Sequence, residues 1–152
     1  MSSSQNTPLV PFQSGSPMMI AGPTGVGKTF FTYQVLKNNM FTEKVKSVLY
    51  CYGVHQPFYE KMELDNLEFY EGVPTLEMLQ NLNDGNFHVV VLDDLMEEIV
   101  KSVELQNLFT KYCHHFNISV MFLTQNLFAQ GPYARTISLN THILVLFAKK
   151  KR

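Results

Sequence analysis

Several features are scarce in this sequence of 152 residues, and each scarcity excludes a class of protein. Only two cysteines are present, Cys51 and Cys113, too few for a disulfide framework, so we expect a reducing, intracellular setting. No apolar run reaches about 18 residues, so no membrane-spanning helix is expected. The N-terminus lacks the charged and apolar regions of a secretion signal. The formal net charge is −1, which leaves no overall basic footprint for nucleic acid.

Arginine is also scarce, because only Arg135 and Arg152 accompany ten lysines. Arginines are the usual clamps on a phosphoryl group during its transfer, so few such clamps are available. The basic residues 149–152 are explained either by a solvated chain end or by a functional basic tail. Residues 1–16 are rich in Ser, Gln, Asn, Pro and Gly, and predict a flexible or loosely docked lead-in. One domain is then expected at 17–148.

Apolar strand segments alternate with helical segments along this domain. Strands are expected at 17–21, 47–52, 88–92, 118–123 and 142–147, and helices at 28–38, 74–82 and 100–116. Most of these strands are continuously apolar, which is typical of a parallel sheet covered on both faces. The sequence therefore predicts an α/β fold: a three-layer sandwich around a mostly parallel sheet of about five strands, with a brief further strand at 67–70 left open.

A glycine-rich loop follows the first expected strand and matches the phosphate-binding Walker A motif. Side chains must be absent at its glycines so that backbone N–H groups can converge on phosphate oxygens, and the next helix adds its N-terminal dipole. We expect Lys28 to reach the β- and γ-phosphates and the Thr29 hydroxyl to reach Mg²⁺. A simple glycine-rich turn is the alternative. The motif consists of Gly22, Pro23, Thr24, Gly25, Val26, Gly27, Lys28 and Thr29.

Two adjacent carboxylates close the strand expected at 88–92. Asp93, at the strand end, can hold Mg²⁺ through water, which is the Walker B role. Asp94 can polarise or deprotonate an attacking water, and two carboxylates suit hydrolysis better than binding alone. Alternatively, Asp94 only caps the following segment, where aspartate is common. Glutamate is the more usual residue at this second place, so the metal assignment is the firmer of the two.

Gln125 belongs to a polar segment that follows the strand expected at 118–123. Parallel strands place their carboxyl ends along one ligand-binding edge, so Gln125 is expected near Lys28 and Asp93. There its amide can orient the attacking water or sense the γ-phosphate. Ordinary loop chemistry after a strand is the alternative.

Arg135 lies in a polar segment, 127–141, where we expect a loop with at most one short helix. As an arginine finger supplied to a neighbouring subunit, it would stabilise charge in the transition state. A surface ion pair is the alternative explanation for a single arginine.

Missing motifs narrow the class of phosphate-binding protein. A small GTPase needs an Asn-Lys-x-Asp segment and an Asp-x-x-Gly switch, and the sequence contains neither in the required place. A nucleotide or small-molecule kinase needs an arginine-rich lid, for which two arginines are too few. An ATPase that couples hydrolysis to motion or assembly remains.

Four segments together resemble the FtsK–HerA superfamily of P-loop ATPases. They are the loop at 22–29, Val-Val-Val-Leu-Asp-Asp-Leu at 89–95, Val-Met-Phe-Leu-Thr-Gln-Asn at 120–126, and Ala-Arg-Thr-Ile-Ser-Leu-Asn-Thr-His-Ile-Leu-Val-Leu-Phe at 134–147. Over roughly residues 17–148, the sequence is most similar to DNA-packaging ATPases of Polinton (Maverick)-type mobile elements and related double-stranded DNA viruses.

The resemblance implies a homo-oligomeric ring, a hexamer or pentamer, that hydrolyses ATP with Mg²⁺ and so pumps double-stranded DNA into a capsid. Its partners would be DNA and capsid proteins, with no membrane, in the host cytoplasm or nucleus and at virion assembly sites. The carried-over roles are nucleotide binding for Lys28 and Thr29, Mg²⁺ ligation for Asp93, general base for Asp94, sensor for Gln125 and finger for Arg135.

Members of that family usually continue beyond the last strand, whereas here Phe147 is followed by only five residues. This departure indicates C-terminal truncation, through either a fragment of a longer ATPase or a degraded element copy. The alternative function is an ATP-binding assembly or regulatory protein that does not translocate DNA.

Overall fold

The computed structural model describes residues 10–125 and 131–148. Six strands form one sheet in the order β3-β2-β4-β5-β1-β6, and every neighbouring pair is parallel. The α/β class with a mostly parallel sheet is confirmed. The brief segment near 67–70 is a full strand that pairs with β2, so the sheet has one strand more than the expected five. The strands are β1 (Pro17–Ala21), β2 (Ser47–Tyr52), β3 (Leu67–Glu71), β4 (His88–Asp93), β5 (Ile118–Thr124) and β6 (Ile143–Leu146).

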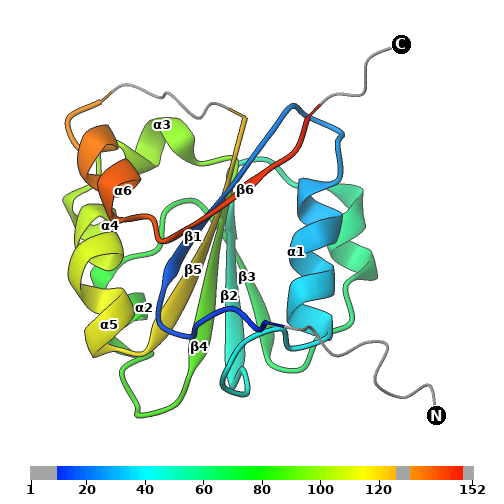
Figure 1. Ribbon diagram of the computed structural model, residues 1–152, viewed down its shortest axis with the longest axis horizontal. Coiled ribbons are helices and arrows are strands. Elements are labelled where there is room, and N and C mark those ends of the chain that lie inside the picture. The colour runs from blue at the N-terminus through cyan, green and yellow to red at the C-terminus, as the bar shows by residue number, and fades with distance from the viewer. Residues whose placement is uncertain (1–9, 126–130, 149–152) are drawn as a thin grey trace.

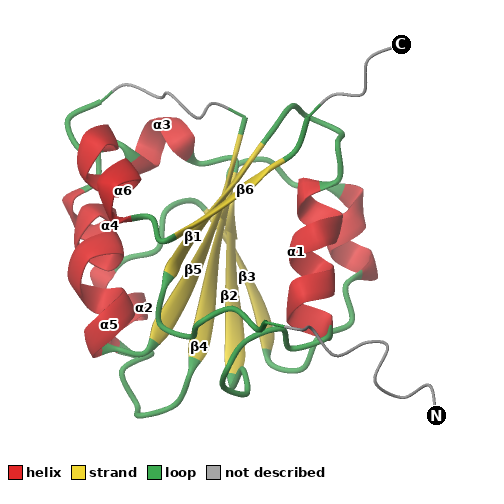
Figure 2. Ribbon diagram, in the orientation of Figure 1, coloured by secondary structure: helices red, strands yellow, loops and turns green. Residues whose placement is uncertain are grey.

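Helices cover both faces of the sheet (Figures 1 and 2). One face carries α1 (Lys28–Lys37) and the 3₁₀-helix η2 (Pro57–Lys61). The other face carries α2 (Leu76–Gln80), α3 (Met96–Ile99), α4 (Val103–Asn107), the π-helical turn η3 (Leu108–Tyr112), α5 (Cys113–His115) and α6 (Ala134–Asn140).

Strands β1, β2, β4 and β5 each contribute to two separate cores, because successive side chains point to opposite faces of a sheet. Val89 and Val91 of β4 belong to the buried cluster that contains residues of α1 and η2. Val90 and Leu92 belong to the cluster that contains residues of α2 to α6. This double burial is why the strands read as continuous apolar runs in the sequence.

The helix expected at 100–116 begins three residues later than predicted and continues through a π-helical turn to His115, which corrects that prediction. Ser102 has an extended backbone and accepts a hydrogen bond from the Leu105 N–H at 3.2 Å, so a new helix begins at Val103 instead of Val100. The apolar face is kept, since Leu105 and Leu108 are fully buried. Local capping here overrides a continuous apolar periodicity.

Helix α2 lies inside the expected range 74–82 but begins at Leu76, and a short helix is present near Arg135. The Thr75 hydroxyl accepts from the Met78 N–H at 3.1 Å and caps α2. α6 lies inside the segment 127–141, of which residues 126–130 fall outside the described part.

Part of the predicted lead-in packs against the domain. Phe12 forms a bridge with Phe41, and the Gly15 N–H donates to the Ser119 hydroxyl at 2.9 Å. Residues 1–9 and the basic residues 149–152 lie outside the described part of the chain. Within the described ranges, no helix has the length and apolar character needed to cross a membrane.

The helices that come next after the neighbouring strands β1 and β5 in the described chain lie on opposite faces of the sheet. α1 follows β1 on one face, whereas α6, the next helix described after β5, lies on the other (Figure 1). Such a divergence opens a crevice at the carboxyl ends of the strands, where parallel α/β sheets bind ligands. The glycine-rich loop lies at this point, between β1 and α1.

Candidate active site

A cavity of about 570 Å³ lies at the carboxyl edge of the sheet, within the usual size range of ligand sites. It brings together segments that follow four different strands: β1, β2, β4 and β5. Gly22, Pro23 and Val26 belong to the loop but not to the lining, and Arg135 does not line the cavity. Predicted site residues that do line it are Thr24, Gly25, Gly27, Lys28, Thr29, Asp93, Asp94 and Gln125.

The loop glycines are required for two different reasons. Gly25 and Gly27 have φ angles of 81° and 104°, in the left-handed region that favours glycine. Space is open around both, since an added Cβ would meet nothing within 4 Å. At Gly22, an added Cβ would lie 2.7 Å from the carbonyl oxygen of Phe147, so the close approach of the segment after β6 requires glycine there.

The start of α1 is suited to an anion. Gly27 is its N-cap and supplies no side-chain hydrogen bond, so the first N–H groups of the helix receive no partner from their cap residue. The first turn contains no acidic residue. The positive end of the helix dipole and these N–H groups therefore meet the cavity without a competing carboxylate on the same turn.

Lys28 lies folded across the loop that precedes it. Its Nζ donates to the carbonyl oxygens of Gly22 at 2.5 Å and Pro23 at 2.9 Å. Burial lowers the pKa of Lys28, while the carboxylates of Asp93 and Asp94 act in the opposite direction. A phosphate entering the loop would offer this ammonium a stronger, charged acceptor than two carbonyl groups.

Asp93 is the hub of a buried hydrogen-bond network. Its Oδ2 accepts from the hydroxyls of Tyr50 and Tyr59, each at 2.7 Å. Two longer contacts of 3.4 Å come from the Thr29 hydroxyl and the Gln56 amide. Burial raises the pKa of Asp93, and the two tyrosine hydrogen bonds oppose that shift by stabilising the ionised form. The network thus fixes the direction of the carboxylate beside Thr29.

Three members of this network, Tyr50, Tyr59 and Gln56, were not anticipated from the sequence. Burial raises the pKa of both tyrosines far above its ordinary value, so both remain neutral hydrogen-bond donors. Gln56 also accepts from the Thr29 hydroxyl at 3.2 Å. The available signal was Tyr50 itself, because a tyrosine inside a buried strand needs a partner for its hydroxyl.

Asp94 has a left-handed backbone, with φ of 58°, and an exposed side chain. This conformation is tolerated by aspartate better than by most residues. Gly53, just after β2, donates its N–H to the Asp93 carbonyl at 2.9 Å, and a Cβ at Gly53 would collide with the Asp94 carbonyl oxygen. The absence of a side chain at Gly53 therefore allows the turn that places Asp94 at the cavity. The sequence alone identifies Gly53 only as the residue that ends a strand.

The structure brings Gln125 into the site and leaves Arg135 outside it. β5 lies between β1 and β4, so Gln125 follows the strand that separates the glycine-rich loop from Asp93. The Gly22 N–H donates to the Thr124 carbonyl at 3.1 Å, which ties the end of β5 to the loop. Arg135 is exposed on α6 and does not line this cavity.

The donor set fits a magnesium ion that arrives with a phosphate ligand. Among the described residues, no group of three or more His, Cys, Asp or Glu side chains could hold a metal. Mg²⁺ does not need one, because it commonly keeps several waters and takes one or two carboxylates together with phosphate oxygens. The Asp93 carboxylate and the Thr29 hydroxyl, 3.4 Å apart, provide oxygen ligands of that kind.

No protein-family model matches this sequence, and no curated protein matches it.

Proposed function

We propose that this chain is a P-loop nucleoside triphosphatase that binds ATP with Mg²⁺ and hydrolyses it to ADP and phosphate. One observation carries the proposal: the glycine-rich loop at the start of α1 shares a cavity of about 570 Å³ with Asp93, Asp94 and Gln125. An anion-binding loop, a metal-ligating carboxylate and an exposed second carboxylate are the parts that phosphoryl transfer to water needs.

Binding of the triphosphate would use the loop and the start of α1. The backbone N–H groups and the Lys28 ammonium would hold the phosphate oxygens. Asp93 and Thr29 would hold Mg²⁺, which when bound neutralises charge on the β- and γ-phosphates. The tyrosines on Asp93 keep its carboxylate aimed at that position.

Hydrolysis would use the exposed carboxylate. Asp94 accepts a proton from a water whose oxygen attacks the γ-phosphorus, while the bond from that phosphorus to the bridging oxygen of ADP breaks. The Gln125 amide, at the end of the intervening strand, would orient the same water. Phosphate and ADP are the products, and the proton on Asp94 returns to solvent.

The test is release of phosphate from ATP by the purified full chain, with Mg²⁺ and with the metal chelated. We expect hydrolysis only with Mg²⁺. Binding of ATP with no hydrolysis under either condition would contradict the enzymatic part of the proposal and leave a nucleotide-binding protein.

We further propose that hydrolysis drives double-stranded DNA through a homo-oligomeric ring, as in capsid packaging. This proposal rests on the resemblance to FtsK–HerA ATPases, and it is supported by the exposed position of Arg135 outside its own cavity, where a finger donated to a neighbouring subunit would lie. Stimulation of the ATPase by duplex DNA is the expected result. A rate that stays flat across all DNA concentrations, with Mg²⁺-ATP binding intact, would favour the assembly or regulatory alternative.

Shared sites between subunits can be tested separately from DNA. Arg135→Ala and Asp94→Asn proteins should each have strongly reduced activity, and mixing them should raise it, because an Asp94→Asn subunit can donate its arginine to a neighbour with an intact base. Mixtures with no recovery would leave Arg135 as a surface residue.

A further inference from the structure

Part of the cavity lining is apolar and unusually exposed. Phe30 is 53% exposed and Val54 is 61% exposed, and Pro57 and Phe58 line the cavity beside them. Large apolar side chains that gather in the open beside a polar site commonly mark a surface that a ligand covers. None of the four side chains can bind a phosphate or a metal, so the proposed chemistry does not account for them.

The two phenylalanines form an oriented pair from different elements. Their ring centroids lie 6.0 Å apart with an interplanar angle of 64°. Phe58 is also in edge contact with Tyr33, at 5.7 Å between centroids, so α1 supports its ring. Phe30, on the first turn of α1, keeps more than half of its surface open. A flat ring placed on this pair would meet preformed aromatic surface.

The apolar residues are continuous with the phosphate-binding residues. Phe30 directly follows Thr29, so it lies one residue beyond the predicted loop. The segment with Val54, Pro57 and Phe58 is held to the same helix end, because Gln56 accepts from the Thr29 hydroxyl at 3.2 Å. A molecule with a triphosphate at one end and a flat ring at the other would reach both parts of the lining.

We propose that Phe30, Phe58, Val54 and Pro57 form a base shelf, on which the base of the bound nucleotide stacks. The inference rests on the proposed nucleotide site and deepens it. Base stacking on aromatic side chains is favourable and tolerates any base, because every base has a π-face. The shelf thereby supplies affinity that the phosphate loop alone does not provide.

The base shelf also determines selectivity. Its four side chains carry no hydrogen-bonding groups, and the nearby Gln56 amide is engaged with Thr29 and Asp93. A site without polar groups aimed at the edge of the base discriminates weakly between similar ligands. ATP and GTP should therefore bind within about threefold of each other, and the smaller pyrimidine nucleotides more weakly.

Tryptophan fluorescence gives a direct test, because the chain contains no tryptophan. In Phe30→Trp, emission should change when ATP binds and stay constant when inorganic tripolyphosphate, which has no base, occupies the phosphate loop. Leu139→Trp is the control: that position is 72% exposed, lies on α6 and does not line the cavity. Its emission should respond to neither ligand.

Calorimetry on Phe30→Ala completes the test. Affinity for Mg²⁺-ATP should fall about tenfold, while affinity for Mg²⁺-tripolyphosphate should stay within about twofold of the wild type. Phe30→Tyr should restore ATP binding, because it keeps the ring.

If wild type binds both ligands and Phe30→Ala binds ATP unchanged, the base shelf is wrong and the phosphate site stands. If wild type binds neither ligand, the proposed nucleotide site and the shelf are both wrong.

Discussion

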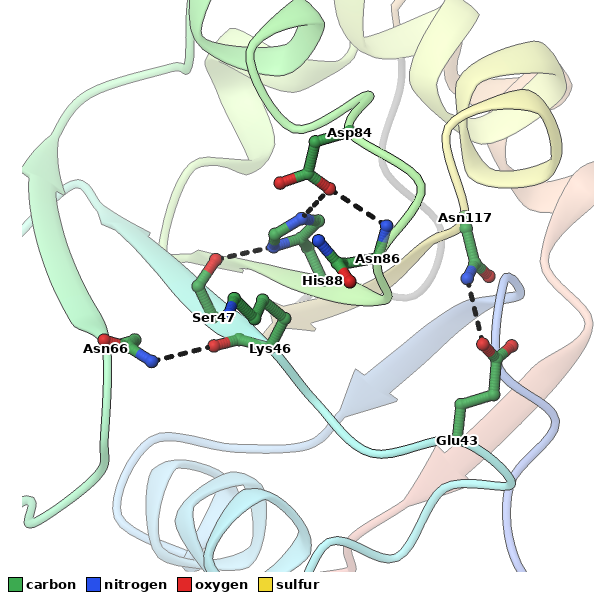
Figure 3. Close-up of polar contacts among 8 residues, drawn as sticks. All are labelled: Glu43, Lys46, Ser47, Asn66, Asp84, Asn86, His88 and Asn117. Atoms are coloured by element: carbon green, nitrogen blue, oxygen red, sulfur yellow. Dashed lines mark hydrogen bonds and ion pairs between the residues drawn. The ribbon is translucent and has the colours of Figure 1, made fainter.

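The two edges of the same parallel sheet carry polar side chains that are arranged in opposite ways. At the carboxyl edge, Lys28, Asp94 and Gln125 line an open cavity. At the amino edge, polar groups bond to one another and tie neighbouring segments together (Figure 3). Polar residues that face a cavity are available to a ligand, whereas polar residues that satisfy each other stabilise the fold.

The centre of the amino edge is a chain of three side chains. The Ser47 hydroxyl lies 2.6 Å from His88 Nδ1, and His88 Nε2 lies 2.8 Å from Asp84 Oδ1. The same carboxylate oxygen accepts the Asn86 N–H at 3.0 Å. Because His88 is 4% exposed and begins β4 beside Ser47 on β2, this chain fixes the two strands to the turn before β4.

Two further hydrogen bonds extend this arrangement. The Asn66 amide donates to the Lys46 carbonyl at 3.1 Å, beside the start of β2. The Asn117 amide donates to a Glu43 carboxylate oxygen at 3.1 Å, beside the start of β5 (Figure 3). Both link loops that precede strands, which is a stabilising role.

Serine, histidine and aspartate in a row have the composition of a hydrolase triad, but the surroundings of Ser47 do not fit one. A triad needs N–H donors for an oxyanion beside the nucleophile. The neighbouring Lys46 N–H donates to the Phe87 carbonyl at 2.7 Å, and the Val48 N–H donates to the Asn66 carbonyl at 3.0 Å. The cavity beside Ser47 measures about 210 Å³, below the usual size of ligand sites. Residue types alone therefore do not separate the two edges, whereas the groups around them do.

Replacing the lysine of the carboxyl edge should have the largest effect. Lys28→Ala should lower ATP turnover by about a thousandfold, because it removes a preorganised charge from the phosphates. Phosphate release and ATP affinity are the measurements. Lys46→Ala removes an exposed lysine near the amino edge and should leave both unchanged. An unaltered rate in Lys28→Ala would refute the assignment of the phosphate-binding loop.

The second prediction compares one aspartate from each edge. Asp94→Asn should lower turnover about a hundredfold while ATP still binds, because the amide cannot accept the proton of the attacking water. Asparagine tolerates the left-handed backbone of this position, so the turn should be kept. Asp84→Asn makes the same chemical change at the amino edge and should leave turnover at the wild-type rate. Equal rates in all three proteins would favour the alternative that Asp94 only caps the following segment.

The third prediction concerns the amino edge, where a substitution should lower the stability of the fold and leave turnover unchanged. His88→Ala removes a buried ring with two hydrogen-bond partners, and should lower the free energy of unfolding by about 2 kcal/mol. Urea denaturation provides the measurement, and turnover per folded molecule should not change. His142→Ala, at an exposed histidine just before β6, is the matched control and should change stability by less than about 0.5 kcal/mol. A loss of turnover in folded His88→Ala would show that the two edges are coupled.

The difference between the edges also explains how much could be predicted from the sequence. Continuous apolar strands indicated a parallel sheet, and parallel strands end at one edge, so Lys28, Asp93, Asp94 and Gln125 were expected together and do lie together. Tyr50, by contrast, reaches Asp93 only because β2 is the neighbour of β4, a pairing that single-strand patterns do not contain.

The same reason applies to residues that depend on close approach, and a local one applies to helix capping. Gly53 is needed because the Asp94 carbonyl packs against it, and Ser102 starts a helix that apolar periodicity placed three residues earlier. The amino-edge chain was missed as well, because Ser47 and His88 become neighbours only through strand register. Spacing along the chain does not encode the contacts of Gly53, Ser47 and His88, whereas the Ser102 cap is a local signal that the apolar periodicity masked.

The smallest effect should be a pH dependence confined to the amino edge. Hydrogen bonds from His88, and then from the Asn86 N–H, lower the pKa of Asp84 from 3.8 to about 2. A lowered pKa in the folded state means that the contribution to stability is present above about pH 4 and is lost as the pH falls toward 2. The Asp84 side chain is 45% exposed, so solvent and salt screen this contribution. The difference in urea midpoint between wild type and Asp84→Asn should therefore shrink across this window, and shrink further with added salt. A midpoint difference that stays constant from pH 5 to pH 2 would mean that the Asp84 carboxylate contributes through shape alone and not through its charge.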